Sequence, residues 1–416
     1  MSINRTTYRS LNKMSLYFFM FIIIYMSDDT YLFRADPEYH IFINIKYFFY
    51  FALLIWMFFK YQKQLFSSDI KLLIALTCLI LLTSFLRFDF TGGYIFQVLT
   101  LFLSYFFVKI IDFKSFAQTY CKFIYFFAWT SIILLILTIL VPSIVSNFPI
   151  IINTSGKETN HLILYTSLVG HTRNAGIFRE PGVYQLYLNF ALFLHIFVLK
   201  KINKKELIVF ILCLLTTAST AGIIIAIITF FVAILFKNDS LAKNSRRNLT
   251  LIAFIFVLVI IFTPAIFTEI FDKLSKDSGF YISTLSRISS LTIPLYMFFQ
   301  SAGSFIIGLG LNDFTLLYVE TSLNLYNFPF TADGTGTNTY LNKFATYGFL
   351  YGFIFMYGML RFSKKVFSKN LLKKYIFFVL LLMMFSNEDV RNSFLFNMIF
   401  FYGMIGQLSE LKLKNL

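Results

Sequence analysis

The sequence contains little charge for its length. Only 13% of its 416 residues are Asp, Glu, Lys or Arg, whereas 58% are hydrophobic. A soluble domain carries about twice that charged fraction. Apolar runs recur along the whole chain, which excludes a soluble domain with a single anchor. The composition therefore predicts one domain, residues 1–416, that crosses a membrane many times.

Cysteines and the common motifs of enzymes are also scarce. The three cysteines, Cys78, Cys121 and Cys213, lie far apart, and their spacing indicates neither a disulfide framework nor a metal site. No Walker loop, DxD, HExxH or CxxC pattern is present. Since acidic residues are few in the expected outer loops, neither a metal nor another cofactor is expected.

The net charge of +16 comes from 36 Lys and Arg against 20 Asp and Glu. The basic residues form short clusters between apolar runs, which is typical of the loops that orient a membrane protein. We therefore expect membrane lipids as partners, and no nucleic acid.

Apolar segments predict an all-α fold of about twelve transmembrane helices. One stretch, residues 206–236, would run about 46 Å as a single helix, against a hydrocarbon core of about 30 Å. The sequence "TTASTAG", with Gly222, favours a tight reversal there between two short helices. The twelve segments are residues 14–31, 45–59, 71–86, 94–110, 123–142, 182–199, 206–220, 221–236, 249–267, 344–360, 375–387 and 393–407.

Charge sets the orientation of these segments. The loops of one parity, both termini included, hold 25 of the 36 lysines and arginines, so both termini are predicted to be cytoplasmic. Two long loops, 142–181 and 268–343, then face outward. The second contains one or two helices that we expect to lie at the outer interface as a helical cap.

The stretch "TRNAGIFREPGVY" places charge where the sixth apolar segment begins. Pro181 suits the first turn of a helix, so Arg173, Arg179 and Glu180 are expected at its outer mouth. Two guanidinium groups beside a helix N-terminus form a natural site for phosphate or diphosphate. The alternative is that the arginines reach toward lipid headgroups.

Two further outer regions carry candidate residues. Arg287 is the one basic residue between Lys276 and Lys343, and the turn 308–310 (Gly-Leu-Gly) would let backbone approach a ligand or a neighbouring helix. Asp333, Asn338 and Tyr340 precede the tenth apolar segment. Asn338 and Tyr340 are candidates for binding sugar hydroxyls or for capping a helix, and His171 is a candidate for sugar binding or for loop surface.

Four stretches together resemble the bacterial O-antigen polymerases and their relatives, the O-antigen ligases and capsule or exopolysaccharide polymerases. They are "TRNAGIFREPGVYQLYLNFAL", "LLTTASTAGIII", "LSRISSLTIPLYMFFQSAGSFIIGLGLNDF" and "TNTYLNKFATYGFLYGFIF", and they cover residues 165 to 360 in the family's order.

The resemblance implies an inverting, metal-independent glycosyltransferase with a membrane-embedded (GT-C-like) fold in the bacterial inner membrane, active on its periplasmic side. Donor and acceptor would be oligosaccharides on undecaprenyl diphosphate. Arg173 and Arg287 would hold the diphosphate, with Arg179 as a further candidate. Glu180 is the first candidate for the base and Asp333 the second. Glu180 has an alternative role in orienting the arginines.

Other activities remain open at this point. The resemblance implies that an O-antigen ligase would have the residue pair "HN" before the tenth segment. This chain has Thr337 and Asn338 there, and the missing histidine argues against a ligase. A transporter or flippase of lipid-linked sugars should place charge in a central cavity and show two related halves, and no repeat is visible here. A chain-length regulator and a flippase are the protein partners that the resemblance raises.

Overall fold

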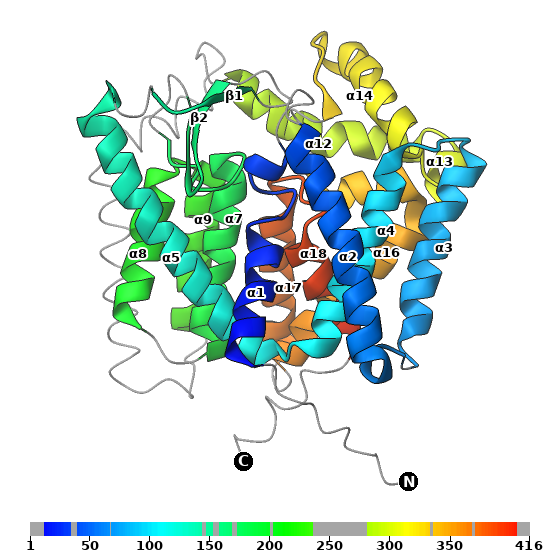
Figure 1. The fold of residues 1–416 in the computed structure, drawn as a ribbon. Helices are drawn as coiled ribbons and strands as arrows, with labels where there is room; N and C mark the ends of the chain where they lie inside the picture. Colours follow the sequence, from blue (N-terminus) through cyan, green and yellow to red (C-terminus); the bar gives the residue numbers. More distant parts are fainter. Residues whose placement is uncertain are drawn as a thin grey trace.

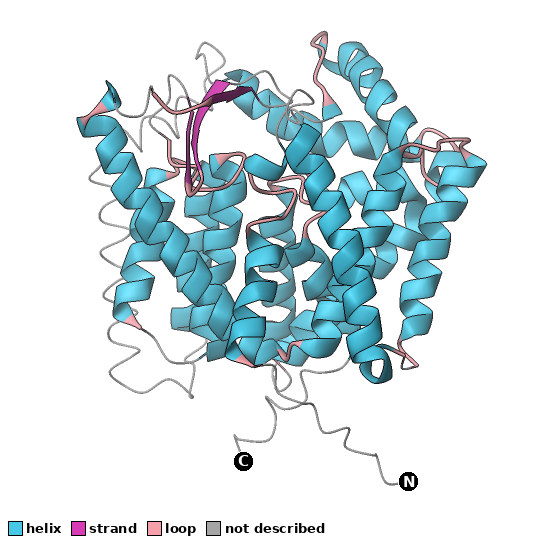
Figure 2. Ribbon diagram, viewed as in Figure 1, coloured by secondary structure: helices cyan, strands magenta, loops and turns pink. Residues whose placement is uncertain are grey.

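The computed structural model describes most of the chain, and the described part is mostly helical (Figure 2). The predicted segment 249–267 lies outside this part. The described residues are 12–34, 40–66, 68–143, 147–152, 158–168, 173–199, 203–235, 281–332, 336–367 and 371–405.

Each of the other predicted apolar segments overlaps a helix, although the first helix ends at Ile24 whereas the predicted segment extends to residue 31. The helices of the bundle are α1 (Lys13–Ile24), α2 (His40–Leu65), α3 (Ile70–Leu86), α4 (Gly92–Ile110), α5 (Phe113–Leu140), α7 (Pro181–Phe193) with its π-helical continuation η3 (Leu194–Leu199), α8 (Lys204–Thr216), α9 (Thr220–Leu235), α16 (Thr339–Val366), α17 (Leu371–Ser386) and α18 (Phe394–Ile405).

Several of these helices have the length and composition of membrane spans. Within the described residues, four are long and apolar enough to cross a membrane: Phe42–Gln62, Gly92–Ile110, Phe113–Leu140 and Pro181–Leu199. Shorter apolar helices are Lys13–Ile24, Ile70–Leu86, Thr220–Ile234 and Phe394–Ile405. Large apolar side chains such as Phe48, Phe85 and Trp129 are exposed on the outside of the bundle. Such a surface fits contact with lipid better than contact with water.

The bundle has two distinct ends (Figure 1). At the lower end α1 begins and α18 ends. At the upper end lie three helices, α12 (Tyr281–Phe299), α13 (Ala302–Ile306) and α14 (Leu311–Tyr326), and a small antiparallel sheet of β1 (Ile150–Ile152), β2 (Glu158–Leu162) and β3 (Tyr165–Leu168). The helices α12 to α14 fall in the region where the sequence predicts one or two interfacial helices. The three strands were not predicted.

Helix α7 lies at the centre of the fold, and all of its side chains are buried. It packs against α5, α8, α9 and α17. Two amides lie on this buried helix: Asn189 Nδ2 donates to the Gln185 side chain and to the Gly222 carbonyl, each at 3.0 Å. A helix buried on every side is expected to be apolar all round. These amides are satisfied only in part, because Gln185 Nε2 and Asn189 Oδ1 have no hydrogen-bond partner among the described residues.

The predicted reversal between α8 and α9 is present, but its glycine has a different role. Helix α8 ends at Thr216 and α9 begins at Thr220. Ala218 takes the left-handed conformation, with φ +46°, whereas Gly222 lies inside α9. A Cβ at Gly222 would stand 2.7 Å from Gln185 Cβ, so this glycine allows α9 to approach α7 closely.

The Gly-Leu-Gly turn, residues 308–310, packs against a break in α16. It therefore approaches a neighbouring helix closely, which was one of the two expected roles. The helix is interrupted at Gly348, with φ +81°, which frees carbonyls in the preceding turn. Leu309 N donates to Ala345 O at 2.8 Å, and Gly310 N donates to Thr346 O at 3.0 Å. A Cβ at Gly308 would lie 2.3 Å from Thr346 O. The turn thus satisfies backbone groups that the break exposes.

The helices α13 and α14 are attached to the turn between α3 and α4. Arg87 Nε donates to Gly308 O at 2.7 Å. The Asp89 carboxylate accepts from Leu311 N at 2.9 Å and from Asn312 N at 2.8 Å. A carboxylate at the N-terminus of α14 satisfies free N–H groups and opposes the positive end of the helix dipole.

Candidate functional site

The segment before α7 is held by the segment that follows α1. Phe178 forms a bridge with Thr30, Tyr31 N donates to Ile177 O at 3.1 Å, and Arg179 N donates to Asp29 O at 3.1 Å. Residues 173–180 therefore have a fixed backbone at the upper end, and Pro181 occupies the first turn of α7 as predicted.

Arg179 is buried under this backbone, with 8% of its surface exposed. One Nη atom donates to the Asp389 carbonyl at 2.6 Å. Its charge is attracted by Glu180, Asp29, Glu388 and Asp389, so negative groups surround the guanidinium.

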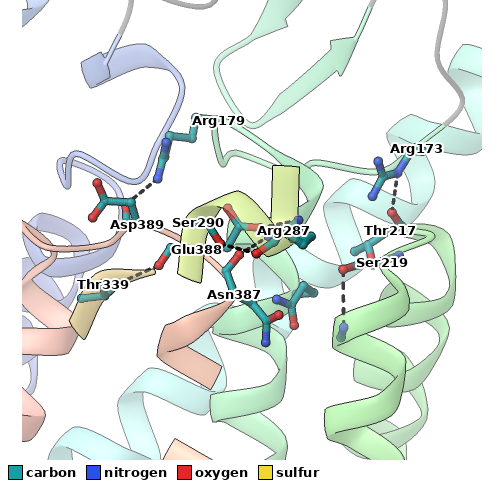
Figure 3. A network of polar contacts seen from close by, with 12 residues as sticks. Arg173, Arg179, Thr217, Ser219, Arg287, Ser290, Thr339, Asn387, Glu388 and Asp389 are labelled. Carbon is teal, nitrogen blue, oxygen red and sulfur yellow. Dashed lines mark hydrogen bonds and ion pairs between the residues drawn. The ribbon is translucent and has the colours of Figure 1, made fainter. Parts of the chain in front are cut away.

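Arg287 of α12 and Glu388, in the turn between α17 and α18, lie at the centre of a cluster of charged residues at the upper end of the bundle (Figure 3). Arg287 Nη2 lies 3.3 Å from Glu388 Oε1, and Nη1 donates to the Asn387 carbonyl. The pKa of Glu388 is raised from its ordinary value, because burial and the charge of Glu180 outweigh the opposing charges of Arg287 and Arg179. Glu388 therefore interacts with all three predicted residues Arg179, Glu180 and Arg287.

The glycine in "REPG", Gly182, makes room for the Glu388 carboxylate. A Cβ at this position would lie 1.8 Å from Glu388 Oε1, so only glycine leaves room for the carboxylate against the first turn of α7. The carboxylate is also near the positive end of the α7 dipole. The backbone carbonyl of Glu388 accepts from Thr339 Oγ1 at 2.6 Å, which joins this turn to the start of α16.

Two acids after α1 extend the cluster on its other side. Asp28 pairs with buried Lys46 of α2 at 2.6 Å. Burial raises the pKa of Asp28, but the charges of Lys46 and Arg34 outweigh it and leave the pKa below its ordinary value. Asp29 accepts from Tyr187 Oη at 2.6 Å, and burial raises its pKa.

A further ion pair lies beside Glu388. Arg391 donates to the Asp389 carboxylate, with Nη2 at 2.8 Å, and to Thr346 Oγ1 at 3.2 Å. Five segments distant in sequence thus contribute charge to one end of the bundle: Asp28 and Asp29, Lys46, Arg179 and Glu180, Arg287, and the stretch from Glu388 to Arg391.

Arg173 is held in a different place from Arg287. Its Nε donates to the Thr217 carbonyl, in the turn between α8 and α9, at 3.0 Å. Figure 3 shows Arg173 on the opposite side of Arg287 from Arg179. The three arginines predicted to bind diphosphate therefore have different partners: Arg287 pairs with the Glu388 carboxylate, Arg179 donates to the Asp389 carbonyl, and Arg173 donates to a separate turn.

The remaining predicted residues have varied positions. Asn338 Oδ1 caps α16 by accepting from Leu341 N at 3.0 Å, in agreement with the capping alternative. Tyr340 is buried, and its ring lies 5.5 Å from that of Phe396. His171 and Asp333 lie outside the described residues.

Four acids of the cluster, Asp28, Asp29, Glu388 and Asp389, were not among the residues predicted from the sequence. In "FSNEDVRNSFLF", three charged residues within four positions, Glu388, Asp389 and Arg391, separate two apolar segments. "MSDDTY" places Asp28 and Asp29 at a similar interruption. Charge between two membrane segments was the available signal, since intramembrane and near-membrane charges usually mark function.

The arrangement can bind an anion. Within the described residues no group of three or more His, Cys, Asp and Glu side chains is placed to hold a metal ion. The partly exposed Arg287 contacts Glu388 beside the first turn of α7, and the charge of Arg179 also acts on Glu388. Comparison with family models, with curated proteins and with solved structures finds no match. Chemistry at this site must therefore be inferred from the residues themselves.

Proposed function

We propose that this chain is a membrane-embedded glycosyltransferase that polymerises a surface polysaccharide, of the O-antigen polymerase kind, from repeat units carried on undecaprenyl diphosphate. The observation that carries the proposal is the exposed Arg287 paired with buried Glu388 at the upper end, where the charge of Arg179 also acts on Glu388. The Arg287 side chain is 43% exposed, so an anionic headgroup can reach it from outside the bundle.

The proposed reaction needs no metal ion in this account. A hydroxyl of the acceptor sugar attacks the anomeric carbon of the donor, the bond from that carbon to the diphosphate breaks, and the lipid diphosphate leaves with the electron pair. The leaving group gains negative charge, which fixed guanidiniums stabilise strongly where little water is present. Arg179 and Arg287 supply the positive charge that stabilises the leaving diphosphate. Half-buried Arg173 is a further contact.

A base must accept the proton of the attacking hydroxyl. Glu180 remains the first candidate because its side chain is partly exposed. It also lies close enough to Arg179 and Glu388 for its charge to raise the pKa of both groups. Asp333 is the second candidate. His171 remains a proposal for contact with sugar, whereas Asn338 caps α16 and Tyr340 is buried.

The proposed sidedness places the upper end on the periplasmic face of the inner membrane and both termini in the cytoplasm. Exposed lysines at the lower end support it, among them Lys114, Lys204 and Lys364, because positive loops stay on the cytoplasmic side.

The test is a deletion strain that carries the wild-type gene or a variant, with the surface glycan separated on a gel. Arg287→Ala and Arg179→Ala should leave a core capped with a single repeat unit, because loss of one such contact lowers the rate by about a hundredfold or more. Arg173→Ala tests the third contact. Lys114→Ala, an exposed lower-end change, should give the normal ladder.

Three other outcomes would contradict the proposal. Normal ladders from Arg287→Ala and Arg179→Ala, with the proteins inserted at normal levels, would remove the arginine site. Long chains held on the lipid carrier in the deletion strain would indicate a ligase, and single units trapped in the cytoplasm would indicate a flippase.

A further inference from the structure

The ion pair between Arg287 and Glu388 is accessible from one side only. The Arg287 side chain is 43% exposed and that of Glu388 is 3% exposed. Their N–O distance of 3.3 Å is longer than the roughly 2.8 Å of a strong charge-assisted hydrogen bond. A ligand anion can therefore reach the guanidinium, and exchange for the carboxylate, without first exposing Glu388.

Glu388 is fixed where it stands. Thr339 Oγ1 donates to its backbone carbonyl at 2.6 Å and accepts from Val390 N at 2.9 Å. The carboxylate fits against Gly182, where a Cβ would lie 1.8 Å from Oε1. When Arg287 turns toward a ligand, Glu388 cannot follow it into solvent.

The charged groups around Glu388 come from each element packed against it. Arg287 comes from α12, and Arg179 and Glu180 precede α7. The start of α16 contributes uncharged Thr339, while Lys343 of the same helix interacts with Arg391 and Asp389. Because Arg179 faces four acids, Arg287 is the cation whose departure leaves Glu388 least compensated.

We propose that Glu388 is an internal counter-ion of Arg287 that a diphosphate displaces, and that the displaced carboxylate binds one proton. This rests on the proposed function, in which a diphosphate is the ligand. Glu388 then stays buried beside Glu180 and the new negative charge, and takes a proton from water. When the diphosphate leaves, Glu388 returns the proton to solvent and the ion pair forms again.

Two physical facts support the coupling. A buried carboxylate without a cation is costly and becomes neutral in preference. Burial already raises the pKa of Glu388 while Arg287 lowers it, so removal of the Arg287 charge raises the pKa further. Binding of the anion must therefore weaken as the pH rises, by up to about tenfold per pH unit for one linked proton.

Titration calorimetry on the purified full-length protein measures this directly. Pyrophosphate is titrated at one pH in two buffers with different ionisation enthalpies, which gives the number of protons taken up on binding. The wild type should take up more protons than Glu388→Gln, the difference approaching one. Because pyrophosphate itself titrates, methanedisulfonate, which stays fully ionised, is the second probe: any proton taken up with it belongs to the protein.

Asp69→Asn is the control, since it removes a carboxylate that pairs with Lys109 at the other end of the bundle. It should bind the same number of protons as the wild type, and thermal unfolding of each variant checks its fold. Should Glu388→Gln not fold, binding of methanedisulfonate to the wild type without proton uptake would still overturn the counter-ion role.

The outcomes separate this inference from the proposed function. Binding of pyrophosphate with equal proton uptake in the wild type and Glu388→Gln overturns the counter-ion role and leaves the diphosphate site in place. No binding of either probe overturns both. Tighter binding of farnesyl diphosphate than of pyrophosphate identifies a lipid-linked ligand, and equal affinity identifies free diphosphate.

Discussion

At the lower end of the bundle the lysines are mostly exposed, whereas at the upper end acids and cations are buried and paired. Lys114, Lys204 and Lys364 extend into the surroundings, and even the Lys109–Asp69 pair leaves the Asp69 side chain 40% exposed. At the upper end Lys46 and Arg179 are buried and contact acids from distant segments.

The exposed and the buried charges have different physical roles. Exposed charges interact weakly, by about 0–1 kcal/mol, and act through their number and side of the membrane. Buried charges are costly to desolvate, so a chain with only 13% charged residues that buries several at one end is expected to use them. Substitutions made at one end at a time test whether the two ends differ in this way.

The largest expected effect on stability comes from Lys46. Lys46→Ala leaves Asp28, whose side chain is only 20% exposed, without its partner, which should lower the free energy of unfolding by about 3–5 kcal/mol. Lys114→Ala at the lower end should change it by less than about 1 kcal/mol. Thermal unfolding in detergent measures both, and equal losses would mean that the two ends do not differ as described.

Gly182→Ala should have a smaller effect on stability, of about 1–3 kcal/mol, because its Cβ would overlap Glu388 Oε1 and force a shift. The same variant should also impair glycan formation, since Glu388 and its partner Arg287 would move. Gly92→Ala, where a Cβ would meet nothing within 4 Å, is the matched control. A folded Gly182→Ala protein with a normal glycan ladder would argue against a role for this contact.

The smallest effect concerns Asp89, which holds α14 to the turn between α3 and α4. Burial raises the pKa of Asp89, but hydrogen bonds from Asn312, Tyr94 and Thr91 outweigh it and lower the pKa. Its stabilisation is therefore complete above the unfolded-state pKa of about 3.9 and is lost as the pH falls through the lower folded-state value.

Asp89→Asn should cost about 1 kcal/mol at neutral pH. The difference from the wild type in thermal unfolding should shrink as the pH is lowered toward and below 4 or so. A difference that stays constant down to that pH would show that the charge of Asp89 contributes nothing.

Much of the helical framework could be predicted from the sequence, because hydrophobic runs and loop residues are local signals. Pro181 marked the start of α7, and "TTASTAG" marked the reversal after α8. The strands at residues 150–168 were missed because a short sheet in a long polar loop gives little periodic signal.

The site could be predicted only in part. Arg179 and Glu180 were recognisable as charges at the mouth of an apolar segment, and Arg287 as the one basic residue between Lys276 and Lys343, but their partners depend on tertiary contacts. Nothing in the sequence around Arg287 indicates that Glu388, a hundred residues later, lies 3.3 Å away. Arg173 and Arg179 are six residues apart, yet they contact different turns, which spacing alone does not reveal.

The most direct test of the account is to cross-link a photoreactive polyprenyl diphosphate to the purified protein and to identify the labelled peptides. The account predicts labels in residues 173–181, 281–290 and 387–391, lost on competition with unlabelled polyprenyl diphosphate and reduced in Arg287→Ala. Labels confined to the lysine-rich segments of the lower end, or labels unchanged in Arg287→Ala, would contradict it.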